Sequence, residues 1–213
     1  MVNHIRLVGV EIEVAGLWGG DLAVALRNGG VPAQFRDYTH DYTEEWKVVR
    51  DGSVSDGCEV VSPPMPRKPM FEALKQVCTI ITGAGGTVDR RCGFHVHHSV
   101  GDFTSMDLWR LALLTIHYEH VVDGLLAPSR RDNRYCARMH HPQSLWYPPI
   151  RRDRRWVEFL RWYVFLQNRR TIPRNGWSDD YLPHYDFDDL DRYQKVNFRS
   201  LGSYGTVEFR QHQ

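Results

Sequence analysis

The sequence has little of what marks several large protein classes. None of its apolar runs approaches the roughly 20 residues that a membrane-spanning helix needs. Its formal net charge is only +1 over 213 residues, which gives no overall field to recruit nucleic acid or an anionic membrane. The N-terminal apolar stretch contains acidic residues and lacks a signal-type cleavage region. We therefore expect neither a membrane protein nor a general nucleic-acid binder.

Cysteine is also scarce and has no metal-binding spacing. The four cysteines include no CxxC pair, which argues against a disulfide framework and against a structural zinc site. Reduced thiols and a cytoplasmic location are therefore expected. With 42% hydrophobic and 25% charged residues, the chain has the composition of a globular protein and is long enough for a sizeable core.

Periodicity predicts the elements of a mixed fold. Alternating apolar and polar residues predict strands over residues 4–14, 45–50, 57–62, 92–100, 196–201 and 205–211. Helical spacing predicts helices over residues 22–28 (capped by Asp21), 71–82, 104–125 and 151–168. Because strands and helices do not alternate strictly, we predict an α+β fold with a mainly antiparallel sheet and helices packed on its outer face. No repeat or linker divides the chain, so residues 1–213 are predicted to form a single domain.

In four predicted strands, acids, histidines or arginine alternate with apolar residues. Side chains two residues apart in a strand project from the same face, about 6–7 Å apart. One face of the sheet would therefore be apolar, whereas the other would gather Glu11, Glu13, Glu59, His95, His97, Glu208 and Arg210.

This pattern has an ordinary explanation and a functional one. Alternation is found in any half-exposed antiparallel strand. Glutamate is nevertheless disfavoured in strands, and clustered like charges repel. The acids are therefore either far apart in space or gathered around a cation, and we favour the cation.

The residue types also indicate which cation and which chemistry. Glutamate with one imidazole suits Mg²⁺ or Mn²⁺ better than zinc. Magnesium sites are usually completed by substrate phosphates, which indicates a nucleotide, and Arg210 suits the charge of a transferring phosphoryl group.

Four segments carry a resemblance to a known family: VGVEIEV, WKVVRDGSVSDGCEVVSPP, CGFHVHHS and KVNFRSLGSYGTVEFRQH. They span residues 8–212 in family order. On these motifs the sequence resembles the putative amidoligase family, part of the carboxylate–amine ligase superfamily that includes glutamate–cysteine ligase and glutamine synthetase.

The resemblance implies a curved sheet that forms a funnel, as in the catalytic domain of glutamine synthetase. Two or three Mg²⁺ or Mn²⁺ ions would lie there between ATP and the acyl substrate. One metal would be held by Glu11, His95 and Glu208, and another by Glu13, Asp51 and Glu59.

The remaining family positions would contact the reactants. His97 and Arg210 would contact the transferring phosphate and, with Asp51, act in catalysis. Ser53, Asn197 and Arg199 would help to bind cofactor or substrate. Asp51 and Ser53 also fit an ordinary hairpin turn, so both interpretations of that segment stay open.

The implied activity is that of an ATP-dependent carbon–nitrogen ligase that forms an amide through an acyl phosphate. Its acid and amine would be amino acids, peptides or protein side chains. The sequence ends three residues after Arg210, whereas relatives continue. We therefore expect a minimal version of the domain, a missing C-terminal portion, or a portion supplied by another subunit of a homo-oligomer. The alternatives are a metal-dependent hydrolase and a catalytically inactive module that binds a nucleotide or a partner.

Overall fold

The computed structural model describes residues 6–37, 43–139, 159, 163 and 187–212. The chain divides into two compact units, Met1–Ser99 with Phe209–Gln213 and Val100–Glu208. The single-domain organisation stays a prediction. The helix predicted over residues 151–168 lies outside the described residues, apart from Phe159 and Tyr163, which are helical and buried.

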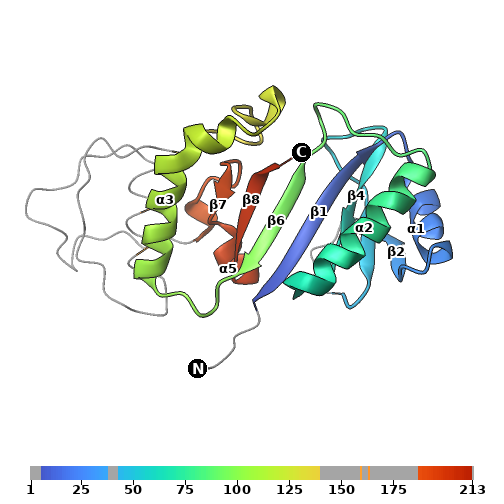
Figure 1. The fold of residues 1–213 in the computed structure, drawn as a ribbon, viewed down its shortest axis with the longest axis horizontal. Helices are drawn as coiled ribbons and strands as arrows, with labels where there is room; N and C mark the ends of the chain where they lie inside the picture. Colours follow the sequence, from blue (N-terminus) through green and yellow to red (C-terminus); the bar gives the residue numbers. More distant parts are fainter. Residues whose placement is uncertain (1–5, 38–42, 140–158, 160–162, 164–186, 213) are drawn as a thin grey trace, which may run out of the picture. The chain divides into compact units, whose positions relative to one another are not determined.

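The first unit is built on a mostly antiparallel sheet (Figure 1). Its strands are β1 (Leu7–Ala15), β2 (Ala33–Arg36), β3 (Trp46–Val49), β4 (Gly57–Val61), β5 (Met65–Pro66), β6 (Phe94–Ser99) and the last residues of β8 (Thr206–His212). They follow the order β2-β3-β4-β1-β6-β8, and β5 pairs with the start of β1. Strand β1 is antiparallel to β4, β5 and β6, and β3 is antiparallel to β4. The α+β class and the antiparallel sheet are therefore confirmed.

The sequence analysis missed β2 and also β5, which has only two residues in a proline-rich segment. Strand β2 pairs with β3 in parallel, with Ala33 opposite Trp46. Its four residues are too few to show a period, and it reaches β3 by long-range pairing that local pattern does not encode.

The apolar face of this sheet forms the core. Alternate residues of β1, from Val8 to Val14, are buried there, and helices α1 (Gly19–Asn28) and α2 (Arg67–Gly83) pack against them. Strand β4 lies so close to β1 that a Cβ atom on Gly57 would collide with the carbonyl oxygen of Val14. Because α1 and α2 cover the apolar face, the polar side chains of the strands lie on the opposite face of the sheet.

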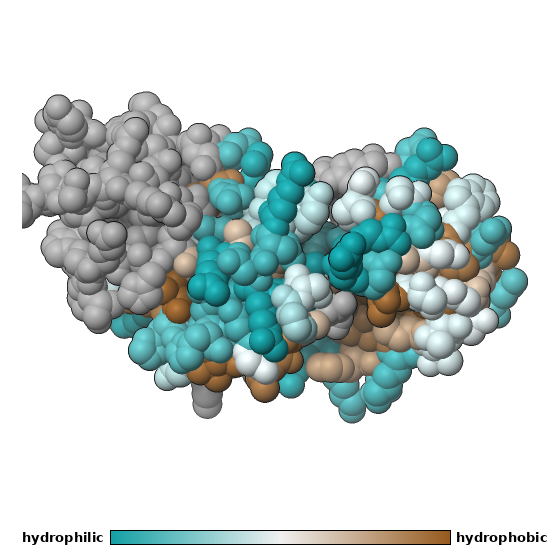
Figure 2. Space-filling view, turned by 90° about the horizontal axis from the view of Figure 1, so that it is seen from above, coloured by the Kyte–Doolittle hydropathy of each residue, from teal (hydrophilic) through white to brown (hydrophobic). Residues whose placement is uncertain are grey.

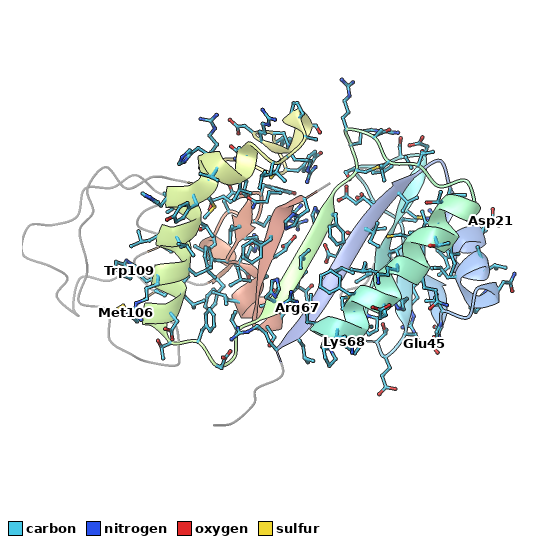
Figure 3. The ribbon with its side chains drawn as sticks, in the orientation of Figure 1. Asp21, Glu45, Arg67, Lys68, Met106 and Trp109 are labelled. Atoms are coloured by element: carbon cyan, nitrogen blue, oxygen red, sulfur yellow. The ribbon has the colours of Figure 1, made fainter. Side chains whose placement is uncertain are left out.

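Both helices begin earlier than predicted. Helix α1 has Trp18 as its N-cap, so Asp21 is not the cap but lies in the first turn, where its charge favours the helix dipole (Figure 3). Helix α2 begins at Arg67 and runs through Pro69, which the first turn of a helix tolerates because its missing N–H has no helical partner there.

The second unit carries helix α3 (Ser105–Asp123), two short 3-10 turns (Pro128–Arg130 and Phe187–Asp189), strand β7 (Val196–Asn197), helix α5 (Ser200–Tyr204) and the start of β8. Thr104 and Asp107 form the capping box of α3. The strand predicted over residues 196–201 is wrong beyond Asn197, because the chain turns into α5. Gly205, with a φ of 64°, then leads into β8.

None of the described helices combines the length and apolarity that crossing a membrane requires. On the face shown in Figure 2, hydrophilic residues are interspersed with hydrophobic ones over the described part of the chain. This mixture agrees with the composition of the sequence.

A buried ion-pair cluster joins the segment before β7 to α3. The Lys195 side chain is fully buried, and its Nζ lies 2.7 Å from Asp123 Oδ1 and 2.9 Å from Glu119 Oε1. The two acids are four residues apart on α3, so they project from the same helix face. Two partners offset the cost of burying the ammonium group, whereas removal of one member leaves buried charge without compensation.

We expect Lys195→Met to lower the free energy of unfolding of the protein by about 3–5 kcal/mol, because Asp123 and Glu119 would then face each other without a cation. Urea denaturation at neutral pH measures the change. The triple variant Lys195→Met, Glu119→Gln and Asp123→Asn should recover most of the loss. A single Lys195→Met variant as stable as the parent would contradict this account.

Candidate functional site

Strand register brings the predicted acids and imidazoles of the first unit together. Glu11 on β1 lies opposite His95 on β6, and Glu13 on β1 lies opposite Glu59 on β4. Side chains of directly opposed residues share one face of the sheet and lie about 5 Å apart at Cβ. The predicted convergence of these four residues on the face opposite the core is therefore observed.

Two imidazoles hold the carboxylate of Glu11. His95 Nδ1 lies 3.0 Å from Glu11 Oε2, and His97 Nε2 lies 3.3 Å from Glu11 Oε1. Burial opposes ionisation of Glu11, but the hydrogen bonds and charges of both histidines together outweigh it and hold the pKa of Glu11 well below its usual range. Glu11 is therefore an anion throughout the physiological pH range.

Glu13 is held by the backbone instead. The Gly93 N–H donates to Glu13 Oε2 over 2.6 Å. The other oxygen, Oε1, lies 3.7 Å from His95 Nε2. His95, only 3% exposed, is thus flanked by a carboxylate at each ring nitrogen, and its ring orientation is fixed by both.

Glu59 is the acid of this cluster whose ionisation its surroundings oppose most. Burial raises its pKa well above the usual range, and the negative charges of Glu11, Glu13 and Asp51 add to that effect, while Arg210 acts against it. Arg210 lies in the part of β8 that belongs to the first unit and is only 8% exposed. Without a cation, Glu59 keeps its proton at pH values where a free glutamate has lost it.

The geometry of this cluster fits a hard divalent cation. Glu11, Glu59 and His95 each offer a ligand atom, and the three atoms lie within 4.8 Å of one another. Two carboxylate oxygens and one imidazole match the donors that Mg²⁺ and Mn²⁺ accept. A cation bound among these residues would favour the ionised form of Glu59, against the burial and the neighbouring carboxylates that raise its pKa.

Asp51 serves the turn between β3 and β4. Its carboxylate accepts hydrogen bonds from the Ser53 N–H over 2.9 Å and from the Ser53 hydroxyl. This is the hairpin-turn role that the sequence allowed. Asp51 is also near enough to raise the pKa of Glu59, so its role as a ligand and that of Ser53 in binding stay predictions.

Three predicted site residues belong to the second unit. Glu208 is 96% buried on β8 and accepts a hydrogen bond from the Asn197 amide over 2.6 Å. The Arg199 side chain pairs at the surface with Asp188, with 2.9 Å between Nη2 and Oδ1. These contacts place Asn197 beside a predicted ligand and direct Arg199 toward an acid of its own unit.

Sequence reasoning missed two features of the site. The Gly93 N–H fixes Glu13, and nothing in the sequence distinguishes that amide from others. Lys47 lies in one row with Glu11, because both are opposite Val61 on β4. Two strand spacings, about 10 Å, separate them. The alternation in EWKVVR already put Lys47 on the polar face and could have identified it.

One comparison with known proteins found a match. A family model described as putative amidoligase enzyme matches residues 4–213. No curated protein and no solved structure matches the chain at a significant level.

The raised pKa of Glu59 makes stability depend on pH. Glu59 binds its proton more tightly in the folded than in the unfolded chain, where its pKa is 4.5. The stabilisation from this proton is complete below pH 4.5 and is lost as pH rises through the folded pKa. We therefore expect the unfolding free energy of the metal-free protein, relative to Glu59→Gln, to fall with pH above 4.5.

Urea denaturation in EDTA at a series of pH values measures this difference. The difference from Glu59→Gln cancels the contributions that other groups make to the pH dependence. One such group is His98, because burial lowers its pKa. Glu72→Gln on the exposed surface of α2 is the matched control and should follow the parent protein. A parent-to-Glu59→Gln difference that stays constant above pH 4.5 would show that Glu59 is ionised without a cation.

Proposed function

We propose that this chain, which belongs to the putative amidoligase family, is an ATP-dependent carboxylate–amine ligase. The observation that carries the proposal is the convergence of Glu11, Glu59 and His95 within 4.8 Å, with the Arg210 charge acting on Glu59. Family membership indicates ligase chemistry, and the site supplies the donors that a phosphate-bound hard cation requires.

The side chains divide into cation holders and phosphate contacts. In the first unit Glu11, Glu13, Glu59 and His95 would hold Mg²⁺ or Mn²⁺, with Asp51 as a further ligand. Glu208 of the second unit is proposed as a ligand from its family motif. Bound cations would neutralise phosphate charge so that an anionic carboxylate can approach. A sheet curved into a funnel, as in glutamine synthetase, is part of the same proposal and is supported by the antiparallel order of the strands.

The proposed reaction has two steps. A carboxylate oxygen of the acid attacks the γ-phosphorus of ATP, the bond to ADP breaks, and an acyl phosphate forms. The nitrogen of the neutral amine then attacks the acyl carbon, the bond to phosphate breaks, the nitrogen releases a proton to a base or to solvent, and an amide and inorganic phosphate result. Arg210 and His97 would contact the phosphoryl group during transfer, because a preorganised cation stabilises its developing charge.

Hydroxylamine provides a test that does not require the natural amine. An acyl phosphate reacts with it to give a hydroxamate, which is detected by its iron(III) complex. The protein is incubated with Mg²⁺, ATP, hydroxylamine and, in turn, amino acids, dicarboxylic acids and short peptides. We expect ADP and a hydroxamate in equal amounts with at least one acid class.

The other outcomes identify the alternatives. AMP in place of ADP would indicate an acyl adenylate and contradict the acyl phosphate. Hydrolysis of a substrate that needs metal but no ATP would identify a metal-dependent hydrolase. ATP binding without turnover across the panel would identify an inactive binding module.

We expect Glu11→Gln to lower Mn²⁺ affinity at least about 100-fold, more than the loss typical of residues that only support a ligand. The neutral amide would also lose the ion pairs with His95 and His97. Isothermal titration with Mn²⁺ measures the affinity, and hydroxamate formation should fall with it. Glu72→Gln is the matched surface control. Unchanged Mn²⁺ affinity in Glu11→Gln would refute the metal assignment.

A further inference from the structure

The Asn197 side chain is held at both ends of its amide. The Arg199 N–H lies 2.9 Å from Asn197 Oδ1, and Asn197 Nδ2 lies 2.6 Å from Glu208 Oε2. A backbone N–H can only donate, so its partner must be the amide oxygen. The amide NH₂ group is therefore directed at Glu208, and its orientation follows from the hydrogen-bond network.

The backbone around Asn197 is fixed as well. The Ser200 hydroxyl lies 3.0 Å from the Asn197 carbonyl oxygen and 2.7 Å from that of Thr206, so it links β7 to β8. Two residues before Asn197, the buried ammonium group of Lys195 is bound by two acids of α3. Asn197 thus projects from a segment anchored on both sides.

The contact between Asn197 and Glu208 is buried and short. The two residues are 6% and 4% exposed, and a 2.6 Å contact between an amide and a carboxylate is a charge-assisted hydrogen bond. It fixes the rotation of the carboxylate, with Oε2 toward Asn197 and Oε1 on the other side. An outer hydrogen bond of this kind orients a metal ligand.

We propose that Asn197 is a positioning residue, which holds the Glu208 carboxylate in its ligand orientation, and that it does not contact nucleotide or substrate. This inference rests on the proposed function, in which Glu208 is a cation ligand. It replaces the binding role that the family motif suggested for Asn197 with a role exerted through Glu208.

Two variants of Asn197 test the inference. Asn197→Ala removes the donor, whereas Asn197→Asp keeps an acceptor for the Arg199 N–H but turns a second carboxylate oxygen toward Glu208. We expect both to lower Mn²⁺ affinity about 10–100-fold in isothermal titration without nucleotide. A high Mn²⁺ concentration should restore most of the hydroxamate rate, because the ligand is misplaced and not lost.

Asn133 offers a matched control in the same unit. Its amide oxygen accepts the Tyr135 N–H and its NH₂ group donates to the Ser129 carbonyl oxygen, so in its hydrogen bonds a carbonyl takes the place of the carboxylate. Asn133→Asp and Asn133→Ala should keep the Mn²⁺ affinity of the parent. Thermal unfolding of all variants confirms that folded protein is compared, and Asn197→Asp carries the test if Asn197→Ala does not fold.

The decisive measurement is the same substitution in a Glu208→Gln background. If Asn197 acts through Glu208, Asn197→Ala should cause no further loss of Mn²⁺ affinity there, whereas a general structural role lowers affinity equally in both backgrounds. Parent-like Mn²⁺ affinity in the Asn197 variants, or a raised KM for ATP alone, overturns the inference.

Failure of the proposed function gives a different result. Mn²⁺ affinity that is unchanged in Glu208→Gln itself removes the assignment of Glu208 as a ligand and overturns the inference with it. A loss in Glu208→Gln without a loss in the Asn197 variants overturns the positioning role alone.

Discussion

Repulsion among the clustered carboxylates of Glu11, Glu13 and Glu59 is the constraint on which the first unit depends. Ligand oxygens of Glu11 and Glu59 lie within 4.8 Å of each other, and two unit charges at that distance repel by roughly 3 kcal/mol at an effective dielectric constant of about 20. Each acid meets this cost differently. Glu11 is bound by two imidazoles, Glu13 accepts a backbone N–H, and Glu59 has a raised pKa that favours its protonated form. Protonation of Glu59 is lost as pH rises, whereas the contacts of Glu11 and Glu13 remain. A bound cation would therefore stabilise the cluster most at Glu59.

This cost explains why the sheet has two chemically different faces. The acids are tolerated because the opposite face of the same strands is tightly packed against α1 and α2, with Val14 and Val60 fully buried. Packing of that face stabilises the strands, whose register then brings Glu13 opposite Glu59. A free sheet would relieve the repulsion by separating its strands. The apolar core therefore maintains the charge cluster.

Local pattern predicted the parts of the fold that depend on one strand or one helix. The alternation around Glu11 identified the polar face of β1, and the helix predicted from residue 104 is observed with Thr104 as its N-cap. The register of the strands was not predictable, because it depends on which strands pair with each other. The parallel pairing of β2 with β3 is the clearest example. The segment after Asn197 alternated like a strand, yet it turns into α5 so that the Ser200 hydroxyl can link β7 to β8.

The candidate site shows the same division. Which residues carry acids or imidazoles, and that they share a face, followed from spacing. Their ionisation did not, because the contrast between Glu11 and Glu59 arises from neighbours on other strands and from burial. The hydrogen bond from the Gly93 N–H to Glu13 could not be predicted either, because every residue except proline has a backbone N–H.

The strand β8 belongs to both units, with Glu208 in one and Phe209 in the other. A ribosome releases residues 1–99 long before residues 209–212, so the edge of β6 that β8 occupies has no partner while the intervening unit is being made. During synthesis that edge is open to pairing with other chains. Arg210 is made well after the acids and histidines of the same unit, so the cluster around Glu59 lacks its arginine until β8 has been synthesised.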